Sequence, residues 1–263
     1  MEFSNKITLM KNSRGVYDLD TSKGCCSGIK ENENGCYGDC YAARYSKRYG
    51  YNFSKTVFRY FEDEYHIREI IDEINTIDMP FVRFGVTGDP SEDWEHTIKI
   101  IEEISKVRQL NLFGLKKRDI VIITKHWNTL TNDQLERLSK LNVCINTSVS
   151  ALDKPSLLRM RLDQYNKLKF YCRSVLRVVS CSFNIDNPIG KKLNKIQNKL
   201  FNNKYVLDNI LRVSQNNELA TNGIINIEKI RFLKKDSYIS RHNKDTYIGS
   251  CSKCPEMCGI NLF

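Results

Sequence analysis

Residues 119–150, DIVIITKHWNTLTNDQLERLSKLNVCINTSVS, contain a predicted strand, a helix and a second strand in succession. The runs Asp119–Thr124 and Val143–Val149 are rich in Ile and Val, as buried strands are. Between them, Asp133–Leu141 has apolar residues at helical spacing. Two strands joined by a crossover helix form the repeating unit of a parallel sheet, so this stretch predicts an α/β fold.

The same alternation continues on both sides of this unit. Further strands are predicted at Gly15–Asp20, Phe81–Val86, Val175–Cys181 and Ile224–Leu233. Further helices are predicted at Tyr65–Ile77, Thr97–Val107, Lys154–Leu168 and Val206–Gln215, and the polar residues 186–204 are predicted to form a long loop or insertion. Six strands are too few for a complete barrel and fit either an open doubly wound sheet or an incomplete (β/α)6 TIM-like barrel. The barrel would span residues 1–235, with a cysteine-containing extension at 236–263.

Length and composition exclude several classes of protein. The chain has 263 residues, of which 41% are hydrophobic, so it is neither disordered nor collagen-like. No apolar run approaches the roughly 20 residues that span a bilayer, and the first residues lack a signal-peptide pattern. We therefore expect a soluble, cytoplasmic protein with no membrane partner.

The positive charge is concentrated in the last third of the chain. Residues 1–160 contain 23 Lys and Arg against 23 Asp and Glu, whereas residues 161–250 contain 17 against 7. A one-sided basic excess fits a polyanionic partner, with nucleic acid as the first candidate for residues 161–250. A solvated surface rich in Lys and Asn would give the same composition.

Seven of the ten cysteines fall into two clusters, Cys25, Cys26, Cys36 and Cys40 near the start and Cys251, Cys254 and Cys258 near the end. Structural disulfides are rare in a reducing compartment, so these clusters indicate metal or iron–sulfur ligation. The first cluster follows the first predicted strand, at the end where parallel α/β folds bind their ligands. No G-x-G-x-x-G or Walker A motif indicates nucleotide binding.

The segment Cys36-Tyr-Gly-Asp-Cys40-Tyr41-Ala42 resembles the cluster loop of the radical S-adenosylmethionine superfamily. Together with Gly24-Cys25 it is similar to the spore photoproduct lyase-like and phage-associated subgroup. The resemblance implies a [4Fe–4S] cluster with one open iron, which binds S-adenosylmethionine. One electron from a flavodoxin- or ferredoxin-like donor then cleaves S-adenosylmethionine to a 5′-deoxyadenosyl radical, which abstracts hydrogen from a substrate.

The resemblance also implies which residues contact S-adenosylmethionine. The Gly88-Asp89-Pro90 turn stands where the family contacts the amino group, and Tyr41 adjoins the last cysteine of the cluster loop. The polar strand end with Thr147, Ser148 and Ser150 would meet the ribose or the carboxylate, and Arg159 or Arg161 would bind the carboxylate. A guanidinium grips a carboxylate through two hydrogen bonds, which gives the last role a physical basis.

The cysteine spacing departs from the C-x3-C-x2-C of the family, because Ala43 stands where its third cysteine would be. The third ligand is then Cys25 or Cys26, and we favour Cys26 because it is nearer to the loop. A structural zinc site would also accept these thiolates. Cys251, Cys254 and Cys258 form a compact C-x2-C-x3-C that fits a second iron–sulfur cluster or a zinc site.

Two functions therefore remain open. The chain is predicted to be a radical S-adenosylmethionine enzyme, with a nucleic acid as the first candidate substrate and a peptide or small metabolite as the other possibility. The alternative is a zinc-stapled nucleic-acid-binding protein without catalysis.

Overall fold

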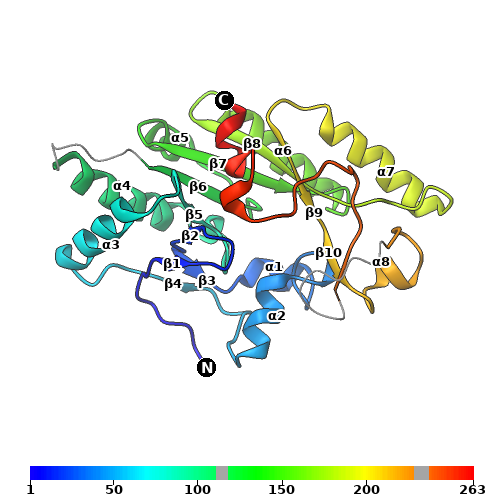
Figure 1. The fold of residues 1–263 in the computed structure, drawn as a ribbon, viewed down its shortest axis with the longest axis horizontal. Coiled ribbons are helices and arrows are strands. Elements are labelled where there is room, and N and C mark those ends of the chain that lie inside the picture. The colour runs from blue at the N-terminus through cyan, green and yellow to red at the C-terminus, as the bar shows by residue number, and fades with distance from the viewer. Residues whose placement is uncertain (111–117, 228–236) are drawn as a thin grey trace.

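A seven-stranded sheet forms the centre of the computed structural model, which describes residues 1–110, 118–227 and 237–263 (Figure 1). The strands are β1 (Met10–Lys11), β2 (Tyr17–Asp18), β5 (Phe81–Phe84), β6 (Asp119–Thr124), β7 (Val143–Val149), β8 (Arg173–Ser180) and β9 (Val206–Ile210), and they lie side by side in this order. All pairs from β2 to β9 are parallel, and only β1 runs antiparallel to its neighbour. The predicted α/β class with a mostly parallel sheet is confirmed.

The helices mostly follow the predicted pattern. They are α1 (Cys26–Glu31), α2 (Tyr41–Arg48), α3 (Glu64–Thr76), α4 (Trp94–Leu110), α5 (Asn132–Ser139), α6 (Pro155–Leu168), α7 (Pro188–Phe201) and α8 (Glu218–Thr221). Local sequence fixes several starts: Asp63 caps α3 by accepting from the His66 amide, and Thr131 forms a capping box with Gln134 at α5. Two short ribbons, β3 (Ser22–Lys23) with β4 (Val57–Phe58) and β10 (Arg212–Ser214) with β11 (Ser237–Ile239), lie beside the main sheet.

Two predictions in the second half of the chain are wrong. The stretch predicted as the helix Val206–Gln215 forms β9 and β10, and the segment predicted as a loop, 186–204, contains α7. Of the predicted strand Ile224–Leu233, residues 228–233 lie outside the described residues, and the remainder contributes one bridge between Phe183 and Ile225. β9 contains the polar residue Asp208, whose carboxylate accepts from the Ser180 and Thr246 hydroxyls.

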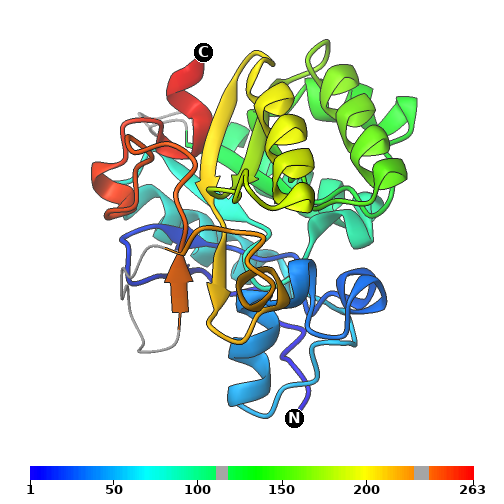
Figure 2. The same ribbon diagram turned by 90° about the vertical axis from the view of Figure 1, so that its right-hand side faces the viewer.

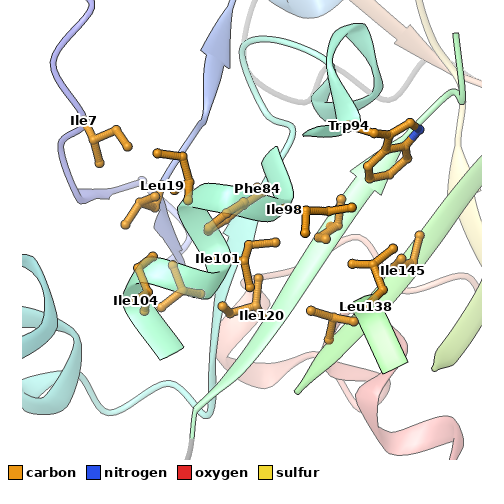
Figure 3. Packing of buried hydrophobic residues seen from close by; sticks show 14 of the residues in the cluster. Ile7, Leu19, Phe84, Trp94, Ile98, Ile101, Ile104, Ile120, Leu138 and Ile145 are labelled. Atoms are coloured by element: carbon orange, nitrogen blue, oxygen red, sulfur yellow. The ribbon is translucent and has the colours of Figure 1, made fainter. Parts of the chain in front are cut away.

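The two faces of the sheet are covered by different parts of the chain. Alternate residues of each strand pack against the helices, for example Phe84, Ile122 and Ile145 against the apolar faces of α3, α4 and α5 (Figure 3). The residues between them, such as Phe81 and Val121, pack against the segment around Met257–Leu262. Figure 2 shows α6 and α7 on one side of the sheet and this C-terminal segment on the other.

The C-terminal segment is anchored by a buried side chain and by a close backbone approach. The Asn146 amide of β7 donates to the Cys258 carbonyl at 3.1 Å. Gly259 has a φ of 87°, and a Cβ there would lie 2.7 Å from a Val175 methyl carbon. Only glycine suits this position, since it tolerates the left-handed backbone and leaves room for Val175.

Candidate functional site

A cavity of about 940 Å³ opens where the loops after the parallel strands gather. Its wall includes Cys36 and Tyr37 of the cysteine loop, Lys125 after β6, Asp153 after β7 and Arg161 of α6. Parallel α/β folds bind their ligands at this end of the sheet, so the cavity is the candidate site.

Glycines let the cysteine loop fold tightly at the edge of the cavity. Gly35 has a φ of 74°, and a Cβ there would lie only 2.4 Å from the Cys40 Cβ. Tyr37 also adopts a positive φ, 61°, within the short 3-10 turn Cys36–Gly38. The Cys25 sulfur accepts from the Gly28 amide at 3.3 Å and so caps α1. Cys25 and Cys40 pack in one apolar cluster with Phe53 and Trp127.

Three thiols, Cys25, Cys36 and Cys40, lie in or near this loop in the sequence. Burial raises the pKa of Cys36 to about 11 against the opposing effect of Lys125, and Cys40 raises it further. Burial also raises the pKa of Cys25, with added contributions from Asp89 and Cys36. The choice between Cys25 and the favoured Cys26 as the third ligand stays a prediction. Cys26 begins α1, where its backbone amide donates to the Thr56 hydroxyl at 3.0 Å.

The chemistry of these side chains suits a soft metal, since all three are free thiols. Across residues 1–110, 118–227 and 237–263, no group of three or more His, Cys, Asp or Glu side chains is placed so that it could hold a metal ion. Of the first cysteine cluster, Cys36 is the residue that lines the cavity.

A buried charged group lies beside the thiols. Asp153 is 2.8 Å from Arg161 and 3.6 Å from the Lys125 amine, and it accepts from the Tyr37 hydroxyl at 2.9 Å. The side chains of Arg161 and Asp153 are 2% and 3% exposed. Burial opposes ionisation of Asp153, but Lys125 and Arg161 outweigh it and lower the pKa of the carboxyl. The group therefore carries one negative and two positive charges next to the cavity.

Two nitrogens on this wall have spare hydrogen-bonding capacity. Arg161 Nη2 and Trp127 Nε1 are buried and have no hydrogen-bond partner in the described part of the chain. The Arg161 guanidinium lies over the Trp127 ring at 4.7 Å, and both residues line the cavity. Because buried donors are normally satisfied, this pair suits a ligand that brings acceptor oxygens, such as a carboxylate.

Two other carboxylates act as internal braces. Asp89 accepts from Ser91 twice, from the Thr124 hydroxyl and from the Lys125 amide, so it ties the turn after β5 to the end of β6. Asp20, which no sequence motif singles out, accepts from the three amides of residues 85–87 and from the Thr87 hydroxyl. Asp89 has its acceptor positions filled from within the protein and holds Lys125 in place.

His126 is a buried neutral residue behind the cavity wall. Its Nε2 lies 3.0 Å from the Thr147 hydroxyl, and burial, aided by Arg161, lowers its pKa to about 3. Its Nδ1 has no partner among the described atoms. Thr147 is thereby engaged inside the sheet rather than at the cavity.

Of the side chains predicted to contact S-adenosylmethionine, Arg161 is the one that lines the cavity. Ser148 and Ser150 are buried, and the Ser150 hydroxyl donates to the Val179 carbonyl at 2.8 Å. Gly88 lies against β3, where a Cβ would be 2.4 Å from the Ser22 carbonyl oxygen. Arg159 is exposed on α6, and Tyr41 is 59% exposed on α2.

The C-terminal cysteines lie on the sheet face that the helices leave uncovered. Cys251 and Cys258 pack beside the apolar residues of that face, and the Cys254 thiol donates to Glu256 at 3.3 Å. Burial raises the pKa of Cys258, while Arg83 and Arg177 oppose the rise. These thiols therefore have cationic neighbours, as the first cluster does.

The described residues include no helix of the length and apolarity that a membrane span requires. Comparison of the chain with protein-family models, curated proteins and solved structures gives no match.

Proposed function

We propose that this chain is a radical S-adenosylmethionine enzyme built on an incomplete (β/α)6 barrel. The observation that carries the proposal is that the Cys36 thiol lines one cavity together with Arg161 and Trp127, whose buried donors lack a partner in the described chain, at the carboxyl ends of parallel strands. Thiolates suit an iron–sulfur cluster, and the nearby donors suit the carboxylate of a ligand on its open iron.

In this proposal Cys25, Cys36 and Cys40 hold the cluster, and the loop glycines allow the wrap that the unusual spacing requires. Arg161 receives the carboxylate of S-adenosylmethionine, while Asp153 and Trp127 hold its guanidinium in place. When bound, the cluster and S-adenosylmethionine supply a one-electron cleavage that yields a 5′-deoxyadenosyl radical for hydrogen abstraction. The Tyr37 hydroxyl donates to Asp153, which is paired with Lys125 and Arg161, and this contact keeps the cysteine loop against the wall.

Other side chains act by fixing the shape of the site. Asp89 and Asp20 brace the turn that contains Gly88, and His126 fixes Thr147. Cys251, Cys254 and Cys258 are proposed to hold a second iron–sulfur cluster, since Arg83 and Arg177 would offset its negative charge. A flavodoxin- or ferredoxin-like protein is the proposed electron donor.

The neighbouring cysteines 25 and 26 offer a matched test. Anaerobic reconstitution of wild type with iron and sulfide is expected to give a brown protein that forms 5′-deoxyadenosine when reduced with S-adenosylmethionine. Cys25→Ala, Cys36→Ala and Cys40→Ala should lose this product, whereas Cys26→Ala should keep it. A second cluster at the C-terminal cysteines would keep some iron in all four variants, so product formation is the deciding measurement.

Two results would overturn the proposal. The first is a colourless wild-type protein that binds zinc and takes up no iron, which would favour the zinc-stapled alternative. The second is product formation by both Cys36→Ala and Cys40→Ala.

A further inference from the structure

Helix α2 has a row of exposed tyrosines. Tyr41, Tyr45 and Tyr49 recur at every fourth residue and are 59%, 46% and 47% exposed. Their rings are neighbours, with centroids 6.3 Å apart for the first pair and 4.6 Å apart for the second. Ala42 and Ser46 form the buried side of the helix, so the tyrosines project from the protein instead of packing in its core.

Cations accompany this row. Arg44 and Arg48 each follow a tyrosine by three residues, which places them beside the row on the helix surface. Arg48 lies 5.9 Å from the centre of the Tyr49 ring. Lys47 is also exposed, and the helix contains no acidic residue. Arg44 is paired with Asp39, and Lys47 is two residues from both Tyr45 and Tyr49 and so lies on another side of the helix. Arg48 is therefore the cation beside the row that is available to a partner.

Another side of α2 borders the candidate site. Arg44 and Lys47 line the cavity, whereas the three tyrosines are not among its lining residues, and α2 follows directly after Cys40. The tyrosine row and the cavity therefore lie on different sides of the same helix.

We propose that the α2 row, defined as Tyr41, Tyr45, Tyr49 and the adjacent Arg48, binds single-stranded nucleic acid. Aromatic faces interleaved with cations are what single strands require, because unstacked bases lie on the rings while phosphates meet the cations. A duplex keeps its bases stacked inside and would leave the tyrosines unused. An acidic protein segment would satisfy the cations alone. That such a strand is also the substrate rests on the proposed function.

The test uses the full chain without iron or S-adenosylmethionine, and measures fluorescence anisotropy of labelled single-stranded DNA and RNA oligonucleotides of mixed sequence. Tyr45→Ala/Tyr49→Ala should weaken binding about fivefold or more for each ring removed. Arg48→Ala should lower the slope of log affinity against log salt by about 0.7, for the one phosphate that the variant no longer neutralises. Tyr65→Ala, at a 70% exposed position on α3, is the matched control and should bind as wild type does.

Several outcomes would overturn the proposal. The first two are no binding of the single strand and equal affinity for a duplex. The third is a loss of affinity in Tyr45→Ala/Tyr49→Ala no larger than that in Tyr65→Ala. The fourth is weaker binding only in Lys195→Ala/Lys199→Ala, at exposed α7 positions. The last result would place the nucleic acid on the basic final third instead. The proposed enzyme activity is scored separately: 5′-deoxyadenosine formation without nucleic acid should be the same in Tyr45→Ala/Tyr49→Ala as in wild type, and its absence from both would refute the enzyme and not the α2 row.

Discussion

Replacing Asp89 with asparagine tests whether this carboxylate braces the site or contacts a ligand. Its Oδ1 accepts from the Ser91 amide at 3.0 Å, from the Ser91 hydroxyl at 2.7 Å and from the Thr124 hydroxyl at 2.7 Å. Its Oδ2 accepts from the Lys125 amide at 2.7 Å. The residue is 7% exposed, so water cannot readily replace these bonds.

The expected loss of stability in Asp89→Asn follows from these four hydrogen bonds. An asparagine NH2 at the Oδ2 position donates instead of accepting, so the Lys125 amide loses a charge-assisted bond worth about 1.5–3 kcal/mol. The other three bonds become neutral and weaken by up to about 1 kcal/mol each, while the uncharged amide is less costly to bury. We expect Asp89→Asn to lower the free energy of unfolding by about 3 kcal/mol, a large share of the roughly 5–15 kcal/mol typical of a domain.

Urea unfolding followed by circular dichroism measures this loss. Asp93→Asn is the matched control: Asp93 accepts from the His96 amide at 3.0 Å at the start of α4, where asparagine caps about as well as aspartate. Its unfolding midpoint should stay close to that of wild type. Equal midpoints for wild type, Asp89→Asn and Asp93→Asn would refute the bracing role. Loss of S-adenosylmethionine binding at unchanged stability would instead support the direct contact that the family resemblance implies.

Three further predictions concern stability. Arg161→Gln should lower the free energy of unfolding by about 3 kcal/mol, since it leaves the buried Asp153 with Lys125 as its remaining cation. Arg159→Gln, on the exposed side of α6, should stay within about 0.5 kcal/mol of wild type in the same urea assay. Gly259→Ala should destabilise the protein more than Gly223→Ala and should expose the C-terminal segment to limited proteolysis. The reason is that both glycines have a positive φ, but only at Gly259 would a Cβ meet Val175. Equal losses would contradict the close approach. The pKa of His126 is about 3 in the folded protein, below the roughly 6.5 of an unfolded histidine. As pH falls between these values, the unfolded chain binds one more proton than the folded chain. The free energy of unfolding therefore drops by up to about 1.4 kcal/mol per pH unit. His126→Asn, which tolerates the φ of 49°, should show a smaller fall between about pH 6 and pH 4 in urea midpoints, and an unchanged slope would argue against a buried neutral histidine.

The centre of the sheet could be predicted from sequence because its signal is local. β6 and β7 have the predicted bounds, since β6 holds four consecutive Ile and Val residues and β7 begins with the apolar Val143, Cys144 and Ile145. α7 also has local signals of its start: Asn187 accepts from the Ile189 and Gly190 amides, and Pro188 occupies the first turn. The many lysines and asparagines that follow made the segment resemble a loop.

Other features depend on residues distant in the chain. β9 includes Asp208 and Asn209, so its strand character emerges only when it pairs with β8. In the sequence, Asp20 looks like an ordinary residue at the end of a strand. Its carboxylate oxygens accept from the amides of residues 85–87 because the parallel pairing of β2 with β5 brings those amides to it. Likewise, spacing does not reveal that the Cys25 sulfur accepts from the Gly28 amide and caps α1.

The order of the parallel strands has a consequence for biosynthesis. From β2 to β9 each strand lies beside the one made just before it in the main sheet, so every new strand and helix can join an edge that has already formed. Closing one such unit spans a short stretch of chain, which favours stepwise growth during translation. At each step, however, the newest strand presents unpaired backbone groups to neighbouring nascent chains. The rate of translation therefore sets how long each newly formed edge strand can pair with another nascent chain.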